Sequence, residues 1–483
     1  MKNKSIITVI LISLLTFFVG CDKDFEEINQ NPNDPVAVPA DLLLGNLLFN
    51  TANNLYNVFG ATDQGSGWAQ HMAKVQYNDE MRYIPREGTI EGRWASFYEI
   101  TASDSDQMVK LAIEQENTAV QGVGLIMKAY GFLMLTDLYG DIPFTEALGA
   151  QEGVFTPVYT EQEQVYSGSI AFLDEAISLL SNSSDEISSS QDLMFGGNKS
   201  NWIKFAASLK FRALMRESGV VNVSSQLQQL VNSGNLFSSR SEEAKFPYLS
   251  DAPNANPLYE TVVFGGRAEY RINQTLVEYM DGTNSLNDDR LPVYAQPSID
   301  AGINIGKPSG FRDLPSPEYN YTSVSEIGLK YLAPDAPAYF VSYTELQFLL
   351  AEAAKKGFIS GGDAAAETFY LRGIESSFTE NGVSASYAGY IAQAGVAYTP
   401  NTALEKIGLQ KWIALYGQGM ETWIEWRRTG IPALTPAIEN DLGSIPVRFT
   451  YPNIEESLNG DNYKAAVSSQ GPDLLTTPVW WDN

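Results

Sequence analysis

The sequence is poor in the residues that most often carry catalysis or bind metals, because its 483 residues include one cysteine, Cys21, and one histidine, His71. A single cysteine excludes a disulfide within the chain, and a single histidine excludes metal sites built on two histidines. A Ser-His-Asp arrangement would have to use His71, which we interpret instead as a hydrogen-bonded structural residue. Glycoside hydrolysis needs only two carboxylates, so it stays as an alternative, but no pair stands out among the 58 acidic residues. We therefore expect a protein that is not an enzyme.

Basic residues are also scarce, with 31 Lys and Arg against 58 Asp and Glu. Nucleic acids and anionic membrane surfaces attract proteins through clustered Lys and Arg, so this balance disfavours both as partners. It disfavours strongly anionic polysaccharides for the same reason. A ligand of this protein is expected to be neutral.

The amino terminus has the features of a lipoprotein signal peptide. Lys2 and Lys4 precede an uncharged run at residues 6–19, which is followed at once by Gly20 and Cys21. The run is shorter than the roughly 20 apolar residues of a membrane span, which fits an export signal. The order of residues 18–21 resembles a bacterial lipobox, so we expect cleavage after residue 20 and acylation of Cys21. Loss of residues 1–20 removes both lysines and takes the net charge from −27 to −29.

The rest of the chain divides into a tether and one domain. Residues 21–40 are rich in Asn, Asp and Pro, which favour turns, so we interpret them as a lipidated flexible tether. Acidic residues directly after Cys21 are similar to surface-export signals, or form a solvated part of that tether. With 44% apolar residues and no Pro/Ser linker in the middle, residues 41–483 are predicted to form a single domain.

Most of this domain is predicted to be helical. Apolar spacing and end signals place helices from about Asp41, at 119–138, at 200–216, from Ser342 to about 355, and at 364–378. Ser342 and Glu345 have the spacing of a capping box, which Thr160 with Glu163 and Thr402 with Glu405 repeat. Paired helices of this length predict a mainly α fold built on a helical-hairpin scaffold, although no segment matches the full tetratricopeptide consensus.

A loop-rich insertion at about 240–335 interrupts the helices. It contains nine prolines, which forbid long helices, and its tyrosines supply flat rings: Tyr248, Tyr259, Tyr270, Tyr294, Tyr319 and Tyr321. Loops on a rigid scaffold are where binding sites concentrate, although large loops also need aromatic residues for packing. We expect this irregular layer to form one wall of a site.

Several segments, taken in order, resemble the SusD/RagB family of nutrient-binding outer-membrane lipoproteins, in its SusD-like branch. They are DFEEIN at 24–29, NP at 31–32, WAQH at 68–71 with Tyr77 and Tyr83, DLYGDIPF at 137–144, NWIKF at 201–205, SLKFR at 208–212, ELQFLLAEA at 345–353, QKW at 410–412, EWRRTG at 425–430, PVRFTYP at 446–452 and WW at 480–481. Together they cover almost the whole chain after Cys21.

The resemblance implies a SusD-like α-α superhelix of four tetratricopeptide-like helix pairs, capped by irregular loops and with little β structure. It further implies a protein that is anchored at the outer membrane and exposed at the cell surface. It also implies a partner, a SusC-like TonB-dependent transporter, to which captured oligosaccharides are delivered. Some members capture peptides, so a peptide-binding protein is the alternative. The ligand loops of this branch vary, so the resemblance does not identify the substrate.

Sugars present apolar C–H faces that stack on aromatic rings, and hydroxyl groups that need fixed polar partners. Two stretches offer both kinds of residue. The first, after a Gly-rich turn at 64–67, holds Trp68, Gln70, Tyr77, Asn78, Arg82 and Tyr83. The second holds Tyr294, Gln296, Arg312, Tyr319, Asn320 and Tyr321. We predict ligand binding at the first stretch, with the second as its wall; the alternative is that Trp68 and Tyr77 belong to the core.

Other residues are assigned to the scaffold. Trp202, Trp412, Trp423 and Trp426 occur at helical spacing and are predicted to pack in the core, and Trp480 and Trp481 to hold the carboxyl terminus. Arg427 and Arg428 are expected to bind carboxylates or helix carbonyls. No cofactor is expected; a structural calcium ion near residues 287–289 is conceivable, but the segment lacks EF-hand spacing.

Overall fold

Five of the six longest helices in the described residues form where apolar spacing and end signals predict them. In the computed structural model, which describes residues 38–284 and 286–482, they are α3 (Leu42–Tyr56), α6 (Thr118–Tyr139), α8 (Lys199–Glu217), α13 (Tyr343–Lys355) and α14 (Gly362–Glu380). About 53% of the described residues are helical and 5% are strand, which confirms the mainly α prediction. The predicted signal peptide, Cys21 and the tether up to residue 37 lie outside the described residues.

The other elements are shorter, apart from α7. Up to residue 246 they are η2 (Val58–Ser66), β1 (Met72–Lys74), η3 (Glu80–Arg82), α4 (Glu87–Ala95), η4 (Ser96–Ala102), α5 (Ser103–Glu114), β2 (Ile142–Pro143), β3 (Tyr159–Thr160), α7 (Gln162–Asn182), α9 (Ser224–Ser233), η5 (Arg240–Glu242) and β4 (Ala244–Phe246). Beyond it they are α10 (Pro257–Tyr259), η6 (Glu260–Phe264), β5 (Tyr270–Ile272), α11 (Gln274–Met280), α12 (Leu291–Tyr294), β6 (Ala338–Val341), η7 (Ser384–Ser386), α15 (Tyr387–Ile391), η8 (Pro400–Thr402), α16 (Ala403–Ala414), α17 (Gly419–Thr429), α18 (Asn453–Leu458) and α19 (Gly460–Gln470).

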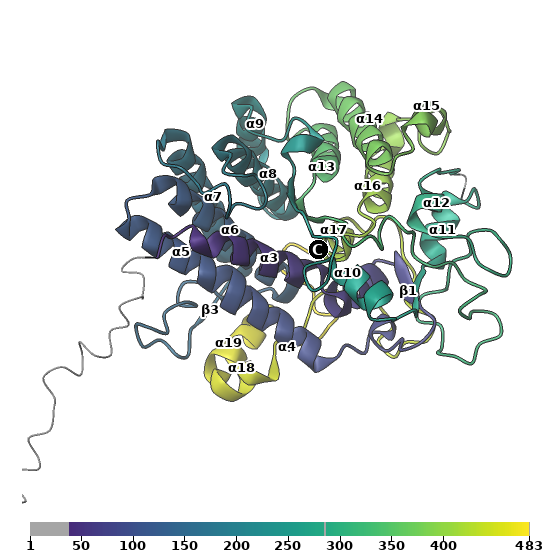
Figure 1. Cartoon of the computed structure of the whole chain (residues 1–483), viewed down its shortest axis with the longest axis horizontal. Helices are drawn as coiled ribbons and strands as arrows, with labels where there is room; N and C mark the ends of the chain where they lie inside the picture. Colours follow the sequence, from purple (N-terminus) through teal and green to yellow (C-terminus); the bar gives the residue numbers. More distant parts are fainter. Residues whose placement is uncertain (1–37, 285, 483) are drawn as a thin grey trace, which may run out of the picture. The chain divides into compact units, whose positions relative to one another are not determined.

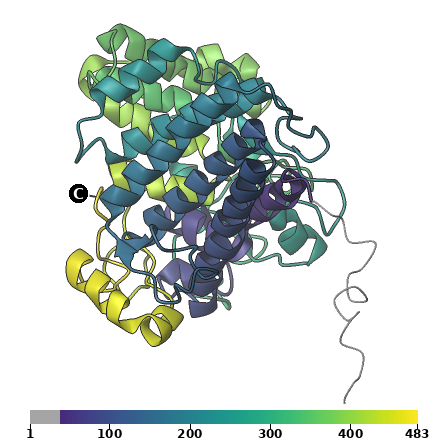
Figure 2. The same ribbon diagram turned by 90° about the vertical axis from the view of Figure 1, so that its left-hand side faces the viewer.

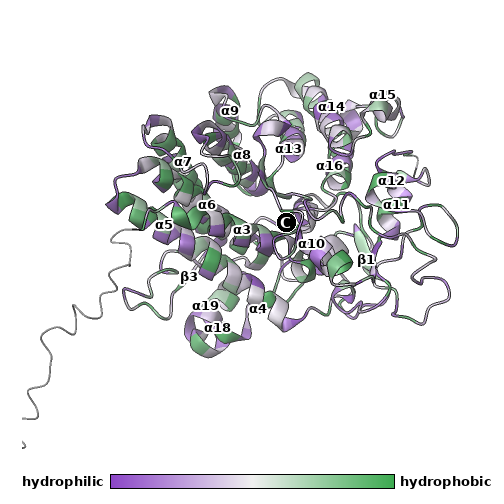
Figure 3. Ribbon diagram, in the orientation of Figure 1, coloured by the Kyte–Doolittle hydropathy of each residue, from purple (hydrophilic) through white to green (hydrophobic). Residues whose placement is uncertain are grey.

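Consecutive helices pack against each other within the unit Ala40–Asn483. The pairs are α5 with α6, α6 with α7, α7 with α8, and α13 with α14. Figure 1 shows α5 to α9 gathered on one side of the unit and α11 and α12 on the other, and Figure 2 shows the same helices turned by 90°. Along these helices hydrophobic and hydrophilic residues alternate, as expected where one face is buried (Figure 3).

Helix α6 is the centre of the larger core. Nearly all of its residues are buried, and Gly124 lets α5 approach closely, because a Cβ there would lie 2.6 Å from Val109 Cγ2. Among the described residues it is the one helix long and apolar enough to cross a membrane, but 83% of its apolar window is buried in the protein. This burial identifies α6 as a core helix.

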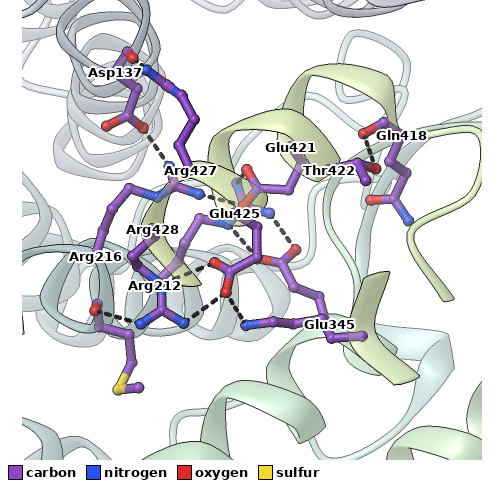
Figure 4. Close-up of polar contacts among 12 residues, drawn as sticks. Asp137, Arg212, Arg216, Glu345, Gln418, Glu421, Thr422, Glu425, Arg427 and Arg428 are labelled. Carbon is purple, nitrogen blue, oxygen red and sulfur yellow. Dashed lines mark hydrogen bonds and ion pairs between the residues drawn. The ribbon is translucent and has the colours of Figure 1, made fainter. Parts of the chain in front are cut away.

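Buried ion pairs connect the helices across the core (Figure 4). Arg216 of α8 binds Asp137 of α6 and Glu421 of α17, and Arg212 Nε donates to Glu345 Oε1 of α13 at 2.6 Å. All five side chains are at most 10% exposed. Leaving any one of these charges unpaired would be costly, so the network fixes how α6, α8, α13 and α17 pack together.

Arg427 and Arg428 have the scaffold role expected of them. Arg427 Nη2 donates to the main-chain oxygen of Asp137 at 2.6 Å, and Arg428 Nη1 donates to Glu352 Oε1 at 2.8 Å. Trp481 Nε1 donates to Asp137 Oδ1 at 3.1 Å, which holds the carboxyl terminus against α6 as predicted.

The tryptophans assigned to the scaffold are in the core. Trp202, Trp412 and Trp423 are at most 2% exposed; the first and last lie in the larger hydrophobic core and Trp412 in the smaller one. Trp426 and Trp480 pack against the larger core while partly exposed. These assignments are confirmed.

The predicted capping boxes are only partly correct. Ser342 Oγ accepts from Glu345 N at 3.1 Å, but the Glu345 carboxylate binds Arg212 instead of reaching back to the cap. Thr160 lies in β3, one residue before the true N-cap of α7, and Thr402 Oγ1 contacts Thr399 rather than the first turn of α16. Tertiary contacts override the local capping signal at these positions.

Residues 240–335 form the predicted irregular layer, whose longest helix is the 7-residue α11. This layer is tied to the amino-terminal part by a short antiparallel pair, β1 with β5, in which Ala73 lies opposite Arg271. The pairing continues where Val75 N donates to Glu269 O at 3.0 Å. Two further pairs, β2 with β3 and β4 with β6, complete the strands of the described residues.

Candidate functional site

Trp68 is not a surface residue. Its side chain is 0% exposed, its ring centroid lies 4.9 Å from that of Trp423 and 5.5 Å from that of Phe449, and its Nε1 donates to Glu80 O at 2.8 Å. A ring enclosed in this way offers no face to a ligand. The prediction of Trp68 as the stacking platform is therefore wrong, and the alternative of a core residue holds.

Gln70, Asn78, Tyr83 and Tyr294 are also buried, at most 4% exposed. Each of them forms a side-chain hydrogen bond within the protein. Gln70 Oε1 accepts from Thr275, Asn78 Nδ2 donates to Asp313, Tyr83 Oη accepts from Ala437 N and Tyr294 Oη donates to Ile413 O. These four residues hold loops together and are corrected from ligand contacts to structural ones.

His71 is structural, as expected, but its imidazole ring is not hydrogen-bonded. Both ring nitrogens are buried and have no hydrogen-bond partner in the described part of the chain. The imidazole packs between rings, with its centroid 4.6 Å from that of Trp412 and 5.7 Å from that of Tyr416. Burial lowers the pKa of His71 to about 3, so the ring is neutral at pH 7.

Five of the predicted residues reach the surface, in two groups. Arg82 and Arg312 both bind Glu439, through its main-chain oxygen at 2.9 Å and its carboxylate at 3.1 Å respectively, and the Tyr319 ring packs on Phe311. Tyr77 and Tyr321 form the other group: they line one surface depression, although they are 244 positions apart in the sequence.

This depression, which we term the tyrosine depression, has a volume of about 530 Å³. Its lining comes from four segments: the residues after β1, the residue before α4, the residues before β5 and the proline-rich layer. The lining residues are Gln76, Tyr77, Arg86, Gly266, Arg267, Ala268, Glu269 and Tyr321. The β1–β5 pairing brings the first and third of these segments together. The site is thus built by tertiary contacts across the loop layer.

The two tyrosine rings are accessible and held in place. Tyr77 is 49% exposed and Tyr321 37% exposed. Tyr77 has a φ of 61°, a left-handed conformation that is uncommon for a tyrosine and sets the direction of its side chain. Tyr321 Oη donates to Gln76 Oε1 at 3.1 Å. Each ring therefore offers apolar surface at a fixed position.

Guanidinium groups support both rings. The Arg267 guanidinium carbon lies 5.5 Å from the Tyr77 ring centroid, and that of Arg271 lies 5.4 Å from the Tyr321 ring centroid. Arg267 Nε donates to Glu269 Oε1 at 2.7 Å, and this hydrogen bond raises the pKa of Arg267. Because the carboxylate neutralises Arg267, the depression offers polar groups without a strong net charge.

Sequence reasoning missed Gln76, Arg86, Arg267 and Glu269. Arg267 and Glu269 precede Tyr270 in the loop layer, and a pair of opposite charges directly before a tyrosine was the available signal. Arg267 and Glu269 lie near Tyr77 because of the register in which β1 pairs with β5, and no local sequence pattern encodes that register.

The described residues hold no group of three or more His, Cys, Asp or Glu side chains that could bind a metal ion. In the segment considered for calcium, the side chain of Asp288 is fully buried and forms an ion pair with Arg290, whose Nη2 lies 2.6 Å from Asp288 Oδ2. Glu269 is the one carboxylate among the residues that line the tyrosine depression, whereas glycoside hydrolysis requires two.

An open, tyrosine-lined depression on a helical scaffold is typical of a protein that binds small molecules. Residues 32–452 match the SusD-like family, whose members are described as starch-binding and associating with the outer membrane. The chain belongs to this family. No curated protein sequence matches it.

Solved structures agree with the family assignment. A chitin-binding protein is 27% identical, with a TM-score of 0.80, over 92% of this chain and 100% of the other. A chitin-binding SusD homologue from Flavobacterium johnsoniae is 24% identical, with a TM-score of 0.79, over 92% and 98%. A SusD homologue from Bacteroides uniformis is 24% identical, with a TM-score of 0.76, over 91% and 99%. The last two show the shared fold.

Proposed function

We propose that this protein captures neutral oligosaccharides at the cell surface through the tyrosine depression. The observation that carries the proposal is the pair of accessible rings, Tyr77 and Tyr321, held by Arg267 and Arg271. Sugar C–H faces stack on such rings, and Gln76, Arg86 and the neighbouring main chain offer polar partners for hydroxyl groups. The family description and the chitin-binding relative support a carbohydrate ligand.

The protein's place in uptake follows from its family. We infer that Cys21 carries the lipid that anchors the protein in the outer membrane, and that a SusC-like TonB-dependent transporter receives the captured sugar. The association with the outer membrane in the family description supports this part of the proposal. The net charge of −27 supports a neutral ligand over an anionic one.

Calorimetric titration of the mature chain with chito-oligosaccharides and a panel of neutral polysaccharides tests the proposal. Tyr77→Ala and Tyr321→Ala should each weaken binding about tenfold, equivalent to about 1.4 kcal/mol, because each removes one stacking face. Tyr319→Ala is the matched control, since Tyr319 lies in the same loop layer but outside the depression.

Wild-type affinity in Tyr77→Ala or in Tyr321→Ala would remove the tyrosine depression as the site. Saturable binding of peptides by a chain that binds no glycan would establish the peptide alternative instead. Shortening of the oligosaccharide during long incubation would show an enzyme.

A further inference from the structure

A second surface depression lies next to the tyrosine depression, and we term it the asparagine depression. Its volume is about 350 Å³. It is lined by Asn50, Asn53, Asn54, Asn57, Phe59, Gly88, Thr89, Gly92, Arg93, Ser96 and Ile100. Amide and hydroxyl side chains thus surround a single aromatic ring. Arg93 is the one charged residue among them.

The four asparagines lie on one face of α3 and its end. Their spacing, i, i+3, i+4 and i+7, places them side by side, while the opposite face carries the buried Leu44, Leu47, Leu48 and Leu55. Asparagine is not a strong helix former, so helix propensity does not account for this face. Helix α4 forms the other wall, because Arg93 Nη1 donates to Asn54 Oδ1 at 3.0 Å.

The α4 wall of the asparagine depression leaves open space at two glycines. A Cβ atom built on Gly88 or Gly92 would meet no atom within 4 Å. At the same time Asn54 Nδ2 is buried and has no hydrogen-bond partner among the described residues. This nitrogen is closed off from the surface, so the groups that a ligand can reach are the other polar side chains of the lining.

The two depressions meet at Arg86 and Phe59. Arg86 lines the tyrosine depression, and its guanidinium carbon lies 5.2 Å from the centroid of the Phe59 ring, which lines the asparagine depression. Arg86 Nε is 2.5 Å from Glu80 Oε1, and Asn57 Oδ1 accepts from Phe59 N at 3.1 Å. Both members of the connecting pair are therefore held in position.

We propose that the asparagine depression is an extension subsite, which binds the continuation of a neutral sugar chain whose first units occupy the tyrosine depression. This rests on the proposed function of the tyrosine depression. Amides both donate and accept hydrogen bonds, so they suit hydroxyl and acetamido groups, and Phe59 supplies one stacking surface. The protein would then prefer long oligosaccharides to short ones.

The subsite can be blocked without removing any contact of the protein. Gly92→Trp on α4 places a bulky ring in the open space at the α4 wall. Replacing a helical glycine with another residue also favours the helix. Gly389→Trp on α15 is the matched control, because this glycine is also exposed and its Cβ position also meets nothing within 4 Å. Asn50→Ala is a second variant that removes one amide and leaves the space open.

Calorimetry with a ladder of chito-oligosaccharides, from the shortest that binds to the octasaccharide, tests the proposal. For the wild type and Gly389→Trp the longest chain should bind about tenfold more tightly than the shortest. Gly92→Trp should lose this gain while binding the shortest chain as the wild type does, and Asn50→Ala should lose part of it.

The two proposals fail in different ways. A length-dependent gain that survives in Gly92→Trp, or wild-type binding that does not depend on length, would overturn the extension subsite alone. Wild-type affinity of Tyr321→Ala for the shortest chain would overturn the tyrosine depression as the site, and the extension with it. A wild type that binds none of the ladder refutes both proposals for this sugar.

Discussion

His71 is the only histidine in the sequence, so the titration of its buried imidazole can be measured without overlap from other histidines. His71 is fully buried between Trp412 and Tyr416, and burial lowers its pKa from 6.5 to about 3. In the unfolded chain the imidazole takes up a proton below about pH 6.5, whereas the folded protein keeps it neutral down to about pH 3. Proton uptake therefore favours the unfolded state throughout this interval.

The magnitude follows from linkage. The stability contributed by neutral His71 is fully present above pH 6.5 and is lost as the pH falls, by about 1.4 kcal/mol per pH unit. Between pH 8 and pH 5 the loss amounts to about 2 kcal/mol. Buried acids act in the opposite direction, because burial raises the pKa of Asp63 to about 6 and that of Glu217 to about 7. A comparison with a variant is needed to isolate His71.

His71→Leu provides this comparison, because leucine has no charge and the imidazole has no hydrogen bond to lose within the described residues. Urea unfolding at pH 8 and pH 5 should show the wild type losing about 2 kcal/mol relative to the variant. In NMR spectra the single imidazole signal should not titrate between these values. A titration midpoint near 6.5, or a stability difference that does not change with pH, would refute the reasoning.

Two further substitutions test the corrected roles of core residues. Trp68→Ala should destabilise the fold by about 3 to 5 kcal/mol in urea unfolding, as large-to-small changes in cores do; a loss below about 1 kcal/mol would contradict its burial. Arg216→Met should cost about 3 to 5 kcal/mol because it removes the buried positive charge that binds both Asp137 and Glu421, whereas the exposed Arg372→Met should be nearly neutral.

The helices could be predicted from the sequence because their signals are local. Apolar spacing along α6 and α8, and the Ser342 cap of α13, depend on residues a few positions apart. The exposure of aromatic residues could not be predicted in this way. Trp68 and Tyr77 occur nine positions apart in one polar and aromatic stretch, yet Trp68 is enclosed by Trp423 and Phe449 while Tyr77 is half exposed.

The position of the tyrosine depression depends on a small number of contacts between distant segments. Lys74 in β1 forms a fully buried ion pair with Asp63 of η2, with Nζ 3.0 Å from Oδ2, and lies 5.0 Å from the centroid of the Tyr270 ring of β5. The strand that leads to Tyr77 is thus fixed on one side to η2 and on the other to the loop layer. Helix η2 in turn packs against α17, which carries Glu421 of the core ion network. A continuous series of contacts therefore connects the rings of the tyrosine depression to the buried charges that hold the helices together. If the tyrosine depression is the site, as proposed, such a scaffold keeps its ring geometry before a ligand arrives, so binding does not have to supply the ordering entropy of the loops.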